Sequence, residues 1–191
     1  FFLFVHGLKS PFWLILIGFI LLFLGGLVSG AINGILIRFG KFTPVAGTLT
    51  SYIGLIGLGF LLRPAPNGYM NASVTNFLSL KVGPIPIVFI ALVVIAVILE
   101  LALHKSKWGM KLRAVGSNEE SARRMGININ KSIIGAYLFA GFFAALGAIM
   151  FIALIGVGDP AQGTPYTLQA ITAVVLGGTS LAGGRGSFVG S

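Results

Sequence analysis

Few side chains of this 191-residue chain are of the types that catalysis or metal binding requires. Asp and Glu together number four, His numbers two and Cys is absent. The absence of Cys excludes disulfides, thiolate zinc sites and iron–sulfur clusters. His6 and His104 lie far apart in the sequence, and no cluster of ligands at metal-binding spacing surrounds either of them. The sequence therefore predicts no metal site and no catalytic residue.

A glycine-rich run, residues 177–187 (GGTSLAGGRGS), invites comparison with two reactive loops. A phosphate-binding P-loop needs Gly-Lys-Ser/Thr after a strand, whereas here Arg185 follows a helical apolar run. The spacing of the glycines around Ser180 is one residue too long for the G-x-S-x-G nucleophile elbow. We interpret the run as close backbone packing where a short helix turns. An intramembrane hydrolase that uses Ser180 and His104 stays open as an alternative.

The remaining acids have structural interpretations. Glu100 stands near the end of an apolar run, where it reaches water or Lys105, although an acid inside a membrane span is by default a functional candidate. Asp159 precedes Pro160 and is expected to make a turn. Glu119 and Glu120 are sequence neighbours that face different ways on a helix, so they do not form a catalytic carboxylate pair.

Residues 116–127 (GSNEESARRMGI) have the pattern of a short, well-capped helix. Ser117 and Glu120 are spaced as a capping box, and Gly126 supplies a left-handed stop. Two acid-before-base pairs, four residues apart, suit the helix dipole: Glu119 with Arg123 and Glu120 with Arg124. A helix of about two turns is marginal in water. We therefore expect it to be held by another surface, such as that of a partner protein.

The composition predicts a membrane protein. Hydrophobic residues make up 56% of the chain and charged residues 9%, against about 25% charged in soluble domains. The net charge of +9 is dispersed between apolar runs, and no basic groove with interleaved aromatic residues can be drawn, so nucleic acid is not an expected partner. The expected surroundings are membrane lipid.

We predict an all-α, polytopic helix bundle. Four apolar runs are long enough to cross a bilayer, which needs about 20 helical residues: 12–37, 43–62, 84–103 and 132–157. A fifth run, 166–182, is shorter and more polar, and it predicts either a broken or re-entrant helix or a plain span that continues beyond Gly183. Its polar residues are the candidates for lining a pathway: Thr167, Gln169, Thr172, Thr179 and Ser180.

The basic residues predict the orientation. The loop 104–131 carries seven Lys and Arg residues against two acids, which places it in the cytoplasm by the positive-inside rule. Alternation adds Arg38 and Lys41 inside, so nine bases lie inside against three outside. The connections 63–83 and 158–165 are then outside. Small residues at packing intervals predict close helix contacts: Gly26, Gly30 and Gly34, and Gly141 with Ala145.

The segment 116–127 and the run 158–184 (GDPAQGTPYTLQAITAVVLGGTSLAGG) together resemble the permease subunit of bacterial ABC sugar importers of the ribose, xylose and galactoside type. The resemblance implies one transmembrane permease domain over 1–191, part of a longer chain with spans missing at both ends. It also implies a multi-pass protein of the bacterial inner membrane. The expected partners are a second permease subunit, forming a homo- or heterodimer, a cytoplasmic ATPase and an external solute-binding protein. ATP and Mg would bind the ATPase, and no cofactor is expected in this chain.

The same resemblance makes 118–125 the coupling helix that sits in a groove of the ATPase, within the cytoplasmic loop 104–131. The residues assigned to this contact are Gly116, Ser117, Asn118, Glu119, Glu120, Ala122, Arg123, Arg124, Met125 and Gly126. The chain departs from the family pattern at Thr167 and Gln169, where relatives commonly carry acids, and at Pro165, where Gly is frequent. The identity of the sugar is not encoded in these motifs. A permease for branched-chain amino acids or another small solute, and a passive channel, stay open as alternatives.

Overall fold

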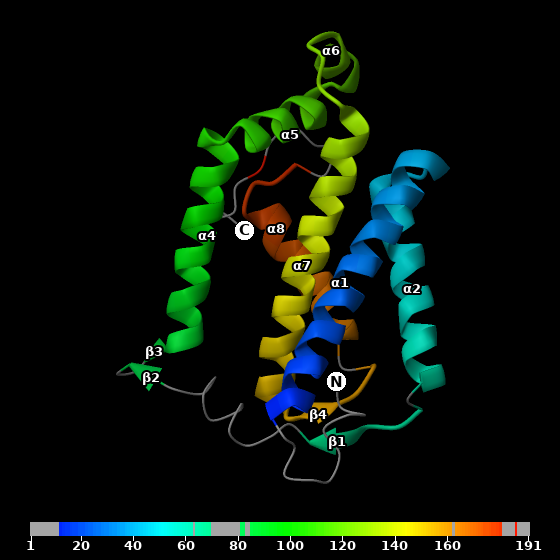
Figure 1. Ribbon diagram of the computed structural model, residues 1–191, viewed down its shortest axis with the longest axis vertical. Helices are drawn as coiled ribbons and strands as arrows, with labels where there is room; N and C mark the ends of the chain where they lie inside the picture. Colours follow the sequence, from blue (N-terminus) through cyan, green and yellow to red (C-terminus); the bar gives the residue numbers. More distant parts are fainter. Residues whose placement is uncertain are drawn as a thin grey trace. The chain divides into compact units, whose positions relative to one another are not determined.

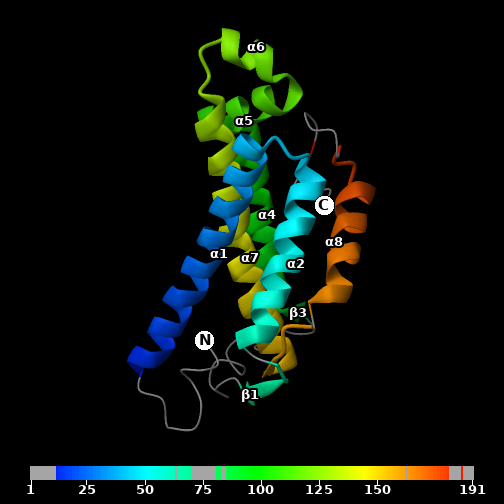
Figure 2. The same cartoon turned by 90° about the vertical axis from the view of Figure 1, so that its right-hand side faces the viewer.

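The computed structural model describes residues 12–62, 64–69, 81–82, 85–161, 163–180 and 186. The chain divides into two compact units, which are described separately. Figures 1 and 2 show the helices of both units, coloured along the sequence. The first comprises residues 1–79 and 134–162, and the second comprises 80–133 and 163–191. The predicted all-α architecture is confirmed: each predicted apolar run contains a helix, and only short strands accompany them.

The first unit is built from three long helices. They are α1 (Phe12–Gly40), α2 (Pro44–Leu62) and most of α7 (Ile129–Ile155). Each contains a stretch long and apolar enough to cross a membrane, and only 6–11% of the residues in those stretches are buried. Apolar side chains that face outward along a whole helix indicate lipid as the surrounding medium.

Helices α1 and α7 approach so closely that only glycine fits at the contact. A Cβ built on Gly141 would collide with the carbonyl oxygen of Gly26, and one on Gly30 with the carbonyl oxygen of Tyr137. Ala145 is buried beside them, and the rings of Phe23 and Phe142 lie 5.1 Å apart. The small residues singled out in the sequence therefore serve packing within one chain, as is common between membrane helices.

Two predicted outer connections meet in this unit. Strand β1 (Asn67–Tyr69) pairs antiparallel with β4 (Val157–Gly158), with Asn67 opposite Gly158 and Tyr69 opposite Val157. The pairing places the start of connection 63–83 beside the start of connection 158–165. The predicted orientation requires both connections to lie on the same side of the membrane, and this arrangement agrees with it.

The second unit contains the polar loop and the shorter helices. A two-residue ladder of β2 (Lys81–Val82) and β3 (Ile85–Pro86) precedes α4 (Ile87–Lys105). Then follow α5 (Lys107–Ser117), α6 (Glu119–Arg124), the first residues of α7 and, later in the chain, α8 (Thr164–Leu176). The described part of the chain has three helices that meet the criteria for a span, and α4 is not among them. A fourth span at α4 stays a prediction.

Candidate functional site

The loop 104–131 is more ordered than the sequence analysis predicted. It contains two helices, and the first of them, α5, was missed. Ser106 begins α5 as its N-cap, because its Oγ accepts a hydrogen bond from the Gly109 amide at 3.0 Å. Gly109 packs so tightly against α4 that an added Cβ would collide with the backbone of Leu103. The sequence has an N-cap candidate here, Ser106, but Gly109 three residues later is not the Glu or Gln of a capping box.

The second helix, α6, begins one residue later than predicted. Its N-cap is Asn118, whose Oδ1 accepts a hydrogen bond from the Ser121 amide at 2.9 Å. Ser117 is instead the last residue of α5, so the predicted capping box of Ser117 and Glu120 is wrong. Asn is at least as good an N-cap as Ser, and Asn118 has the extended backbone that the position requires. Its amide also donates to the Ala114 carbonyl, so one residue ends α5 and begins α6.

The predicted stop at Gly126 is confirmed. Gly126 has φ +77°, and the backbone closes a Schellman motif around it. The Gly126 amide donates to the Arg123 carbonyl at 3.0 Å, and the Ile127 amide donates to the Ala122 carbonyl at 3.1 Å. These two bonds use carbonyls that the helix end would otherwise leave without a partner. Both ends of α6 are thus satisfied by residues of the segment itself.

A small apolar cluster holds α6 in place. Ala122 is fully buried and packs with Val115 of α5 and Ile129, the first residue of α7. Ile127, Ala114 and Ile133 pack around them. Since Ala122 is the one buried residue of α6, the helix touches the rest of the second unit along a single face.

The opposite face of α6 is exposed and charged. Glu120 and Arg124 form an ion pair at 2.9 Å, as predicted, with both side chains about three-quarters exposed. Such a pair contributes little to stability, on the order of 0–1 kcal/mol. Met125 adds an apolar side chain that is 65% exposed. The exposed surface therefore combines charges of both signs with one apolar residue. The pair of Glu119 and Arg123 stays a prediction.

The pathway candidates lie on or after α8, which is only 13 residues long. Gln169 and Thr172 are exposed and share one side of the helix, whereas Thr167 is half-buried and lies on another side. The Thr172 hydroxyl donates to the Leu168 carbonyl at 2.8 Å, so this side chain is satisfied within the helix. The structure thus brings two of the candidates onto one face, and their role stays a prediction.

Helix α8 ends at the glycine run. Gly178 has φ +82°, its amide donates to the Val175 carbonyl, and the Thr179 amide donates to the Val174 carbonyl. The same Schellman geometry that ends α6 stops α8 at Leu176. The alternative of a plain span that continues beyond Gly183 falls on residues 181–185, which lie outside the described residues. Pro165 stands in the first turn of α8, where proline is tolerated. Thr179 and Ser180 follow the helix, and Arg185 lies outside the described residues.

The other chemically interesting residues have local partners. His104 Nδ1 lies 3.0 Å from the carbonyl oxygen of Glu100 and 3.3 Å from its Oε1, one turn back on α4. Asp159 accepts a hydrogen bond from the Ala161 amide at 2.9 Å, which confirms the predicted turn. Within the described ranges no three His, Asp or Glu side chains come together as a metal site. His6 lies outside those ranges.

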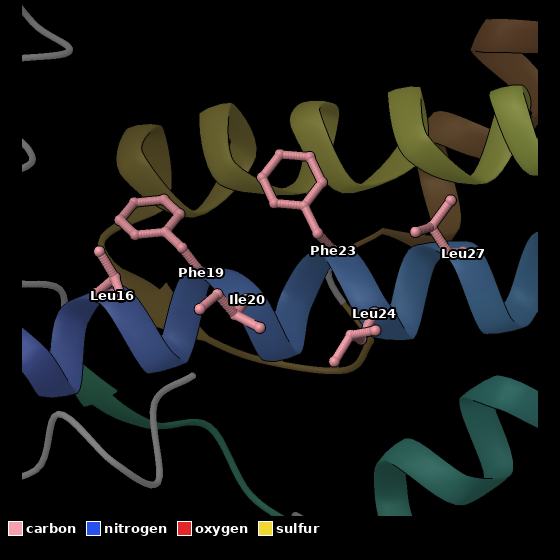
Figure 3. Close-up of a pocket in the computed structure, with 6 residues that line it drawn as sticks. All are labelled: Leu16, Phe19, Ile20, Phe23, Leu24 and Leu27. Carbon is pink, nitrogen blue, oxygen red and sulfur yellow. The ribbon is translucent and has the colours of Figure 1, made fainter.

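A hollow of about 460 Å³ opens beside α1 in the first unit (Figure 3). Its lining residues are all apolar: Leu16, Phe19, Ile20, Phe23, Leu24 and Leu27. Phe23 points from α1 toward α7, where it meets Phe142 (Figure 3). A surface without hydrogen-bonding groups cannot satisfy the hydroxyls of a sugar, so this hollow is not a sugar site.

The apolar helices and the glycine-mediated contacts between them define a polytopic membrane protein. Residues 2–191 match the family described as the permease component of the branched-chain amino acid transport system, and the chain belongs to this family. No solved structure was found to match the chain.

Several curated relatives carry sugar-transport names. The ribose import permease protein of Escherichia coli K12 is 35% identical over 173 residues, which cover 87% of this chain and 53% of the relative. That of Bacillus subtilis is 36% identical over 162 residues, covering 83% and 50%. The galactose/methyl galactoside import permease protein of Haemophilus influenzae is 30% identical over 173 residues, covering 86% and 52%. This chain thus spans about half the length of these relatives.

Proposed function

We propose that the chain is part of the permease subunit of an ATP-driven importer in a bacterial inner membrane, and that α6 is its contact with a separate ATPase. The observation that carries the proposal is α6 itself. It is a helix of six residues, satisfied at both ends, held along one face by Ala122 and exposed on the other. A helix this short does not persist in water without support. The cluster under Ala122 supplies that support and leaves the outer face available to a partner.

The packing of α6 suggests how a displacement of this helix would be transmitted to the neighbouring helices. Val115 and Ile129 meet at Ala122, so a displacement of α6 pushes on α5 and on the start of α7 together. Gly109 places α5 in direct backbone contact with the end of α4. When the ATPase pair closes on ATP and Mg, α6 moves as a rigid body and tilts the helices joined to it. The chain itself then needs no cofactor.

The solute that we propose is a monosaccharide. Relatives at 30–36% identity are import permeases for ribose and for galactose or methyl galactoside. We further propose that an external solute-binding protein delivers the sugar and that a second permease subunit, identical or different, completes the pathway. Gln169 and Thr172 on α8 are the candidates for contacts along that pathway. The family description keeps a branched-chain amino acid as the second candidate solute.

Uptake into liposomes tests the proposal. The full permease is reconstituted with its own ATPase and binding protein, and uptake of labelled ribose, galactose, fructose and leucine is measured with and without ATP. We expect uptake of one of the sugars that depends on both ATP and the binding protein. Leucine uptake would favour the second candidate solute. Uptake without ATP would identify a passive channel, and conversion of the solute without transport would identify an enzyme; either outcome contradicts the proposal.

A further inference from the structure

The corner between α4 and α5 carries an unbalanced positive charge. Lys105, Lys107, Lys111 and Arg113 are all exposed, and no Asp or Glu occurs between Leu101 and Asn118. Among the described residues none of these four bases is in an ion pair. By contrast, α6 carries two acids and two bases, so its own charge is balanced. The two neighbouring helices therefore present surfaces of different electrostatic character.

Helix α5 has a defined position next to the end of α4 and the start of α7. It turns away from α4 at Ser106 and runs across the end of that helix, with α6 beyond it (Figure 1). Gly109 rests on the backbone of α4, and Val115 packs against Ile129. Ile129 is the residue at which the apolar stretch of α7 begins. Helix α5 thus lies at the level where a membrane-spanning helix meets water.

The side chains of α5 suit that level. Gly109 and Val115 are buried against the protein, while Lys107 and Lys111, one turn apart, share an exposed side. Trp108, which follows Lys107 in the sequence, is 40% exposed. Tryptophan is enriched where headgroups meet hydrocarbon, and lysine keeps its charged end in water while its stem lies along apolar surface.

We propose that the exposed bases of this corner, Lys105, Lys107, Lys111 and Arg113, bind the headgroups of anionic phospholipids. Charge complementarity favours this occupant, because the cytoplasmic leaflet is negatively charged and attracts juxtamembrane basic residues. An acidic protein surface is less suitable, since α6 projects farther from the span and would meet a protein partner first. Held in this way, α5 is a brace at the membrane surface that fixes the depth from which α6 projects. The inference does not depend on which solute is carried.

Fluorescence quenching by brominated lipids tests this proposal. The full permease is prepared with Trp13→Phe and with Trp108 as its single tryptophan, then placed in phosphatidylcholine nanodiscs. A minority lipid brominated in its acyl chain, either phosphatidylglycerol or phosphatidylcholine, quenches Trp108 on contact. We expect phosphatidylglycerol to quench at lower mole fraction. The preference should fall by roughly fivefold for each base removed, as in Lys107→Gln/Lys111→Gln, and it should weaken in high salt.

Arg123→Gln/Arg124→Gln is the matched control, because it removes the same charge from α6. It should leave the lipid preference unchanged. Equal quenching by the two lipids in the parent protein, or the same loss in the control, overturns the proposal. So does a Lys107→Gln/Lys111→Gln protein that keeps the preference but loses the ATPase subunit on purification. If that variant does not fold, a preference in the parent protein that survives high salt overturns the proposal equally.

Discussion

At the scale of single residues, Asn118 decides where one helix ends and the next begins. Its amide bonds back to Ala114 while its side chain bonds forward to Ser121. Ser117 was predicted as the N-cap, because its spacing to Glu120 fits a capping box. Ser117 cannot be the N-cap of α6, because it is the last residue of α5 and a helical residue does not have the extended backbone of an N-cap.

Replacing Asn118 tests this assignment. Asn118→Ala should destabilise α6 by about 0.5–2 kcal/mol, since the Ser121 amide loses its acceptor. Asn118→Asp should retain most of the stability. Hydrogen exchange of the amides of α6 in the purified permease measures the effect. Ser117→Ala, the control, should change the exchange little; larger loss of protection there than in Asn118→Ala would contradict the assignment.

Gly126 provides a second test at this scale. A Cβ added there meets nothing within 4 Å, so any cost of substitution comes from its φ of +77° and not from crowding. Residues other than glycine pay about 1–2 kcal/mol in this region, and Asn tolerates it best. Gly126→Val should therefore reduce ATP-dependent transport more than Gly126→Asn. Equal transport by both variants would show that the end of α6 does not depend on this glycine.

At the scale of elements, long apolar runs predicted helices well, whereas of the two polar helices α6 was predicted and α5 was missed. Length and hydropathy suffice for α1, α2 and α7, because backbone groups in lipid must bond within the segment. Helix α5 was not predicted, because its sequence is polar. It is held by tertiary contacts, such as that of Gly109 with α4, which the sequence pattern does not indicate. The pairing of β1 with β4 was also not predicted, because it joins residues that lie far apart in the sequence.

The contact of α1 with α7 gives a prediction for whole helices. Gly141→Val should separate the two helices, because the added side chain would occupy the place of the Gly26 backbone. Overpacking of this kind costs about 1–3 kcal/mol. The melting temperature of the detergent-solubilised permease should fall. Gly25→Ala is the matched control, since its Cβ would have no neighbour within 4 Å and the melting temperature should hold. A similar drop for both would indicate that the close approach is unimportant.

At the scale of the whole molecule, one chain contains both long apolar helices and a short polar helix. Three apolar helices identify the lipid-embedded part, and the family match over residues 2–191 identifies its class. Helix α6 was predictable in its position and its glycine stop. Its N-cap and its attachment through Ala122 were not, because both depend on how α5 ends.

The central claim is that α6 contacts an ATPase subunit, and a single cysteine tests it most directly. The chain contains no Cys, so Ser121→Cys places one exposed thiol on α6 at little structural cost. Thr164→Cys, at the start of α8 in a predicted outer connection, is the control. In membranes that contain the assembled importer, a thiol–amine crosslinker should join the Ser121→Cys permease to the ATPase subunit and should not join the Thr164→Cys permease. Absence of the crosslinked product from Ser121→Cys, or equal yields from both variants, would contradict the account.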